Sequence, residues 1–271
     1  MPQLWTFESA GAGTVLPAGT VSALLDVASA PADAGRLLRA VRTVVPAAYL
    51  SLVRVRRDAP ELVEGCACRP QDDAVVSQCF AIYRRRYYRQ DAMLPLAAEL
   101  ASQRSSGMAV LHCRADELPD AGWRSDIYER ERLADRFTLL HAPTAGQVQA
   151  IHVYRDDRLG PLQPDELERL LGLAPLLGQA HAAAWRVQGA REDRDQHVAE
   201  REQRLRRLAP GLSARERAVC ARIAQGMSAD GIAVDLDVAP STVVTLRKRA
   251  YLKLAEAGLP AERLGLARLL H

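Results

Sequence analysis

Residues 212–254, LSARERAVCARIAQGMSADGIAVDLDVAPSTVVTLRKRAYLKL, decide the fold of the C-terminal part of this chain. Ser213 and Glu216 form an S-x-x-E capping box, which opens a helix. Gly226 ends that helix, because a residue without Cβ is favoured in the left-handed region. Ser228 then caps a short second helix. Two helices so close together predict a compact helical domain.

A third helix follows over residues 241–254. Pro240 suits its first position, and Gly258 ends it. A fourth helix is predicted over 260–270, where leucines recur at helical spacing. A tight turn between the second and third helices makes a helix-turn-helix, whose second member fits the major groove of DNA.

The third helix combines small, polar and basic side chains and has no acidic residue before Glu256. It also holds the only two lysines of the chain, and residues 208–271 contain 9 basic and 6 acidic residues. A basic surface of this kind favours the phosphates of nucleic acid. The residues that we expect at double-stranded DNA are Ser228, Ser241, Thr242, Val244, Thr245, Arg247, Lys248, Arg249 and Lys253.

The segment resembles the LuxR-type (NarL/FixJ-type) helix-turn-helix of transcription regulators, over about 60 of the 271 residues. The matching positions are Leu212, Ser213, Arg215, Glu216, Val219, Ile223, Ala224, Gly226, Ser228, Ile232, Ala233, Leu236, Val238, Thr242, Val243, Lys253 and Leu254. The resemblance implies a sequence-specific DNA-binding regulator that acts as a homodimer. It also implies that the fourth helix pairs two copies through Leu264, Leu266 and Leu269.

The segment departs from this pattern at five positions. Ala239 stands where a Ser or Thr cap is usual, Leu246 replaces His, and Gly231 replaces Glu. Asp235 and Asp237 place acids where the DNA backbone is expected. The departures keep an alternative open, in which a degenerate DNA-binding domain acts by binding another regulator.

Four regions are predicted along the chain: an N-terminal tail (1–19), an α+β sensor domain (20–185), a charged linker or helix (186–207) and the helix-turn-helix domain (208–271). Within the sensor domain, alternating apolar residues predict strands at 48–56, 61–66, 108–112, 137–141 and 148–154. Helical patterns surround them, including one at 123–134. An antiparallel sheet with flanking helices resembles GAF or PAS folds, in which one face of the sheet holds a small ligand.

A Tyr/Arg-rich segment, Tyr83-Arg-Arg-Arg-Tyr87-Tyr88-Arg-Gln-Asp91, follows one of these helices. It is similar to the segment of autoinducer-binding domains in which aromatic residues line a pocket and Asp accepts a hydrogen bond from the amide of an acyl-homoserine lactone, although Ala92 replaces the usual Pro. The expected ligand-binding residues are Tyr83, Tyr87, Asp91, Trp123 and Phe137. The alternative is that Tyr83 and Tyr87 are ordinary core aromatics.

Several chemistries are excluded. No lysine precedes residue 248, so the N-terminal part has neither a P-loop nor a phosphoacceptor receiver site. The spacing of the five cysteines fits no disulfide framework or zinc site. We expect no enzyme, metal or cofactor, because the histidines His112, His141, His152 and His181 occur in no catalytic motif, although His141 and His152 share a predicted hairpin. Without a long apolar run or a secretory signal, the expected location is the cytoplasm.

Overall fold

A computed structural model describes residues 2–7, 16–55, 59–102, 107–144 and 146–270. These residues form two compact units, Met1–Gln188 and Gly189–His271, each with its own hydrophobic core. Residues 8–15 of the predicted tail, and Arg56 at the end of one predicted strand, lie outside the described residues. In the part of the chain that the structure covers, no helix combines the length and the apolar content needed to cross a bilayer.

One antiparallel sheet forms the centre of the N-terminal unit, and its described strands follow the order β1-β4-β5-β6-β2-β3. The strands are β1 (Gln3–Phe7), β2 (Tyr49–Val55), β3 (Pro60–Ala67), β4 (Met108–Arg114), β5 (Leu133–Thr144) and β6 (Gln147–Asp156). The last five confirm the strands predicted from the sequence. β1 was not predicted, because five residues at a sheet edge show too little alternation and their partner β4 is remote in the sequence.

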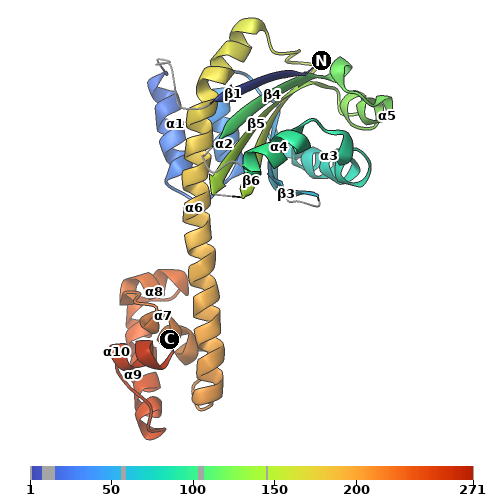
Figure 1. Cartoon of the computed structure of the whole chain (residues 1–271). Coiled ribbons are helices and arrows are strands. Elements are labelled where there is room, and N and C mark those ends of the chain that lie inside the picture. Colours follow the sequence, from blue (N-terminus) through green and yellow to red (C-terminus); the bar gives the residue numbers. More distant parts are fainter. Residues whose placement is uncertain (1, 8–15, 56–58, 103–106, 145, 271) are drawn as a thin grey trace. The chain divides into compact units, whose positions relative to one another are not determined.

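Helices cover both faces of the sheet (Figure 1). One face packs against α1 (Ala18–Ala28), α2 (Ala34–Arg42) and the first part of α6 (Pro164–Leu208). On the other face lie α3 (Asp73–Arg86), η1 (Pro70–Asp72), η2 (Tyr88–Gln90), α4 (Met93–Ser102), η3 (Ala115–Glu117), α5 (Ala121–Trp123) and η4 (Arg124–Glu129). The helix predicted at 123–134 is shorter than expected, since Arg132 takes a positive φ of 56° and β5 begins directly afterwards.

Alternation along β5 decides which side chains each face receives. Phe137 and Leu139 lie in the core beneath α1, α2 and α6. Arg136 lies on the opposite face, in a cavity beneath α3 and η4. Thr138 shares that face, because its hydroxyl lies 2.9 Å from Nδ1 of His152, another residue of the cavity wall.

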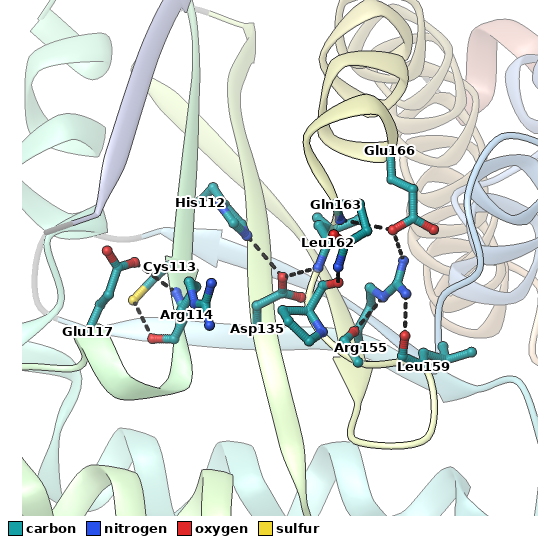
Figure 2. Close-up of polar contacts among 12 residues, drawn as sticks. His112, Cys113, Arg114, Glu117, Asp135, Arg155, Leu159, Leu162, Gln163 and Glu166 are labelled. Carbon is teal, nitrogen blue, oxygen red and sulfur yellow. Dashed lines mark hydrogen bonds and ion pairs between the residues drawn. The ribbon is translucent and has the colours of Figure 1, made fainter.

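Buried charged groups hold the beginning of α6 against the sheet (Figure 2). The Asp135 carboxylate lies 3.0 Å from His112 Nε2 and accepts the backbone N–H of Leu162 at 2.7 Å. Arg155 of β6 pairs with Glu166 in the first turn of α6 at 2.8 Å. β5 and β6 therefore fix the position at which α6 begins.

The C-terminal unit is helical. It consists of α7 (Ala214–Ala224), α8 (Ala229–Asp235), α9 (Pro240–Glu256), α10 (Arg263–Leu269) and the end of α6. Val219, Ile232, Val243 and Leu254 are buried in its core, together with Leu205 of α6. Gly226 ends α7 with a φ of +93°, as the sequence predicts.

α6 includes residues 186–207, for which the sequence allowed either a linker or a helix. The polar composition of this segment fits a solvated helix, since most of its side chains are exposed. The predicted fold class, an α+β unit with an antiparallel sheet followed by an all-α unit, is confirmed.

Candidate functional site

α8 and α9 form the helix-turn-helix of the C-terminal unit. Ser228 caps α8, because its Oγ accepts the backbone N–H of Gly231 at 3.1 Å. Asp237 occupies the turn with a left-handed φ of +51°, a conformation that is costly for a residue with a Cβ. Ala239 stands at the N-cap of α9 and makes no side-chain cap hydrogen bond. The beginning of α9 is therefore supported by Pro240 and backbone geometry alone.

The outer side of α9 presents most of the side chains predicted to meet DNA. Ser228, Ser241, Val244, Thr245, Arg247, Lys248 and Arg249 are exposed, whereas Thr242 and Lys253 are half-buried. Val243, Ala250 and Leu254 point into the core instead. We call Ser241, Val244, Thr245, Arg247, Lys248 and Arg249 the α9 surface. It joins side chains able to contact base edges with cations able to contact phosphates.

Lys253 is engaged within its own unit. Its ammonium lies 2.7 Å from Oε2 of Glu216, whose side chain is only 4% exposed. The same Oε2 accepts the backbone N–H of Ser213 at 2.7 Å, which completes the capping box of α7. Burial raises the pKa of Glu216, but the hydrogen bonds from Lys253 and Ser213 outweigh it, so the pKa lies below its usual value. Lys253 thus joins α9 to α7.

A second candidate site lies between the sheet and α3, α5 and η4 of the N-terminal unit. It is a cavity of about 50 Å³ with an aromatic wall. The aromatic lining residues are Tyr49, Phe80, Tyr83, Trp123, Tyr128 and Tyr154. Ser51, Arg136 and His152 supply polar groups from the strands. We call this space the aromatic cavity.

Asp91 lies behind the wall of the aromatic cavity and its carboxylate is fully engaged. Arg136 donates two hydrogen bonds to it, at 2.8 and 3.0 Å. Tyr83 donates its hydroxyl proton at 3.0 Å, and the backbone N–H of Met93 donates at 3.1 Å. Burial raises the pKa of Asp91, but the charge and hydrogen bonds of Arg136 outweigh it and lower the pKa below its ordinary value.

The ligand-binding residues predicted from the sequence are only partly brought together. Tyr83 and Trp123 line the aromatic cavity, with ring centroids 5.5 Å apart. Tyr87 does not line the cavity: it stacks on Trp123 and donates its hydroxyl proton to Asp126 at 2.6 Å. Phe137 is not brought together with them, because strand alternation places it on the opposite face of the sheet. Arg136, the preceding residue of β5, lines the aromatic cavity instead.

The histidines are also separated by the sheet. His152 lines the aromatic cavity, whereas His141 lies on the other side, with its Nε2 2.8 Å from Nδ1 of His181 in α6. Burial lowers the pKa of His152 to about 3 and that of His181 to about 4, so both rings are neutral near pH 7. In the described ranges, no group of three or more His, Cys, Asp or Glu side chains is placed to hold a metal ion.

Residues 210–260 match the family model described as bacterial regulatory proteins, luxR family. The C-terminal unit contains a LuxR-family helix-turn-helix domain. The chain is also 58% identical over 52 residues to the probable transcriptional regulatory protein NarL of two Mycobacterium tuberculosis strains. This match covers 19% of the chain and 24% of the relative, so the chain spans about a quarter of the length of these curated relatives.

Two solved structures show a more distant likeness. CepR2 of Burkholderia cenocepacia, described as an N-acylhomoserine lactone dependent LuxR family transcriptional factor, is 18% identical and covers 64% of this chain and 99% of its own, with a TM-score of 0.46. SdiA of Escherichia coli is 19% identical over 92% of this chain and 94% of its own, with a TM-score of 0.38.

The structure places Asp235, a departure from the usual pattern, and the α10 leucines predicted to pair two copies. Asp235 is bound by Arg222 at 2.5 Å, and Arg222 also binds Glu202 of α6 at 2.8 Å, so the Asp235 charge is compensated. Of the α10 leucines predicted to pair two copies, Leu264 is 59% exposed, whereas Leu266 is fully buried in the core of its own unit. Leu269 is half-buried.

Proposed function

We propose that this chain is a sequence-specific DNA-binding transcription regulator whose N-terminal unit responds to a small ligand. The observation that carries the DNA-binding part is the α9 surface, where Arg247, Lys248 and Arg249 are exposed together on the second helix of a LuxR-family helix-turn-helix. Val244 and Thr245 lie one turn closer to the N-terminus of α9, as base-contacting side chains do in this kind of motif.

A salt titration of DNA binding tests this proposal. The full chain is used to select a site from a random duplex library, and its affinity is measured at increasing salt concentration. Because each phosphate contact contributes about 0.9 to the slope of log affinity against log salt, Lys248→Ala and Arg247→Ala are each expected to reduce the slope by about that amount. Arg194→Ala, at an exposed arginine of α6, is the matched control and leaves the slope unchanged.

Sequence choice is tested separately from affinity. Val244→Ala and Thr245→Ala are expected to change which bases the selection enriches, with little effect on the salt slope, because they carry no charge. Slopes that stay at the wild-type value in both basic variants would exclude the α9 surface as the DNA-contacting surface.

The ligand-responsive part rests on the aromatic cavity. A buried space lined by six aromatic side chains and three polar groups has the composition of a small-molecule site. β5 carries Arg136 on the cavity side, and the adjacent Asp135 holds the backbone of Leu162 just before α6 on the other side. A shift of β5 on ligand binding is therefore passed to the start of α6, which continues to Leu208 and contributes Leu205 to the core of the C-terminal unit.

We further propose that the regulator acts as a homodimer paired through α10, because Leu264 leaves a large apolar side chain in water. Sedimentation of wild type and Leu264→Glu tests the pairing, and a dimer that persists in the variant rules out α10 as its interface. Leu266 is not suitable for this test, because its replacement would damage the core.

The alternative function is a regulator that binds another regulator through a degenerate DNA-binding domain. It is favoured by the uncapped Ala239 and by the exposed Asp237 beside the N-terminus of α9. Failure of the random-library selection to enrich any site at low salt would support this alternative over DNA binding.

A further inference from the structure

Two residues of the aromatic cavity wall carry hydrogen-bond donors without partners among the described residues. Among the described residues, the Tyr128 hydroxyl and the Nε of Arg136 are buried and make no hydrogen bond. Tyr128 is 2% exposed and Arg136 is 4% exposed, and both line the cavity. A buried donor without an acceptor lowers the stability of the folded protein. A native protein usually retains such a donor where a ligand or a water molecule accepts its hydrogen bond.

The acceptor that could receive a ligand N–H is already used. The Asp91 carboxylate accepts four hydrogen bonds from the protein itself, two of them from Arg136. A ligand that must donate an amide proton to this carboxylate would have to displace Arg136, and it would leave a guanidinium unpaired in the interior.

The charge of the cavity is balanced without a ligand. Arg136 and Asp91 form an ion pair whose side chains are 5% and 1% exposed. Burial and the charge of Arg136 lower the pKa of His152 to about 3, and burial raises the pKa of Cys79 to about 12, so neither carries charge near pH 7. An anionic ligand would therefore bring an unpaired charge into the interior, which is strongly unfavourable.

We propose that the aromatic cavity binds a flat, uncharged ligand with an accepting oxygen, such as an aromatic ketone, whose oxygen receives hydrogen bonds from Tyr128 and Arg136. This inference rests on the proposed ligand response and names the class of ligand. The aromatic wall stacks on the flat ring. A cavity of about 50 Å³ has to widen for a ring, and the half-buried side chains of α3, among them Cys79 and Phe80, form the wall that moves.

Calorimetric titration of the full chain with four probes tests the proposal. Acetophenone has the ring and the accepting oxygen, ethylbenzene lacks the oxygen, benzoate adds a charge, and N-hexanoyl homoserine lactone adds an amide donor. Acetophenone is expected to bind about tenfold more tightly than ethylbenzene, as one or two added hydrogen bonds allow. It is also expected to bind about tenfold more tightly than benzoate, which brings an unpaired charge, and than the lactone, whose amide donor finds no free acceptor at Asp91.

Two variants distinguish the hydrogen bond of the Tyr128 hydroxyl from the packing of its ring against the ligand. Tyr128→Phe keeps the ring and is expected to reduce the preference for acetophenone over ethylbenzene to about twofold. Tyr251→Phe, which removes a hydroxyl from the other unit, is the matched control and leaves the preference unchanged. Circular dichroism checks that both variants are folded.

Three results would overturn the proposal: no binding of acetophenone, equal binding of acetophenone and ethylbenzene, or tighter binding of benzoate or the lactone. Each of these rejects the ligand class and leaves the proposed DNA binding intact, because DNA affinity is measured on the same protein without any probe. The DNA-binding proposal is rejected by a different result, an unchanged salt slope in the Arg247→Ala and Lys248→Ala variants.

Discussion

Asp91→Asn is expected to destabilise the N-terminal unit more than any surface substitution would. The variant keeps the shape of the side chain and removes the charge that pairs with Arg136. Because the Arg136 side chain is 5% exposed, its guanidinium stays in the interior without an anion. Breaking a buried ion pair from one side costs about 3–5 kcal/mol in the free energy of unfolding.

Tryptophan fluorescence during urea unfolding measures this effect in the intact chain. Trp5, Trp123 and Trp185 all belong to the N-terminal unit, so the signal reports on that unit alone. Arg136→Met provides the second step of a double-mutant cycle. With both partners replaced, most of the lost stability is expected to return, because no buried charge is left unpaired.

The pH dependence supplies an independent check. The pKa of Asp91 is lowered in the folded chain. The ion pair therefore contributes its full stabilisation of the folded N-terminal unit above the ordinary carboxyl pKa. That contribution is lost as the pH falls toward the lowered pKa of the folded state. The difference between wild type and Asp91→Asn is therefore expected to be the same at pH 7 and pH 6. A cost below about 1 kcal/mol, or additive effects in the double variant, would refute the assignment of a stabilising buried pair.

Four further predictions concern single side chains. Tyr128→Phe is expected to stabilise the ligand-free N-terminal unit by about 1 kcal/mol in the same fluorescence assay, because it removes a buried hydroxyl without a partner. Ala239→Ser is expected to raise the stability of the C-terminal unit by about 1 kcal/mol, as measured by circular dichroism, by capping α9; no change would show that the backbone alone satisfies this helix start. Asp237→Gly is expected to raise the stability of the C-terminal unit by about 1 kcal/mol, because glycine adopts a positive φ without strain. Asp237→Asn, which keeps the Cβ, is expected to raise that stability by less. Glu216→Ala is expected to lower the melting temperature of the C-terminal unit, at a cost of about 2 kcal/mol, because it removes half of the capping box and the partner of Lys253.

The C-terminal unit was predictable because its signals are local. A capping box, a glycine at a helix end and a proline at a helix start each act within a few residues, and Ser213, Gly226 and Pro240 lie where these signals predict. The bond between Lys253 and Glu216 was not predictable, because it joins two residues that are 37 positions apart and lie on different helices.

The aromatic cavity was only half predictable. Tyr83 and Asp91 lie on one helix and the turn that follows it, so their spacing indicated that they act together. Arg136 is 45 residues from Asp91 and belongs to a strand. The sequence did hold one signal for it: along β5 the apolar Phe137 and Leu139 alternate with Arg136 and Thr138, so the polar pair had to share a face. Phe137, favoured in the sequence because it is aromatic, lies on the face opposite the aromatic cavity.

The ion pair between Lys253 and Glu216 has a practical consequence for chemical labelling. Lys248 and Lys253 are the only side-chain amines in the sequence, and one of them is held against a buried carboxylate. An amine-acylating reagent should therefore modify Lys248 first among the side chains, in the middle of the α9 surface. The extent of acylation at this residue, followed by mass spectrometry, would report directly on whether that surface is covered.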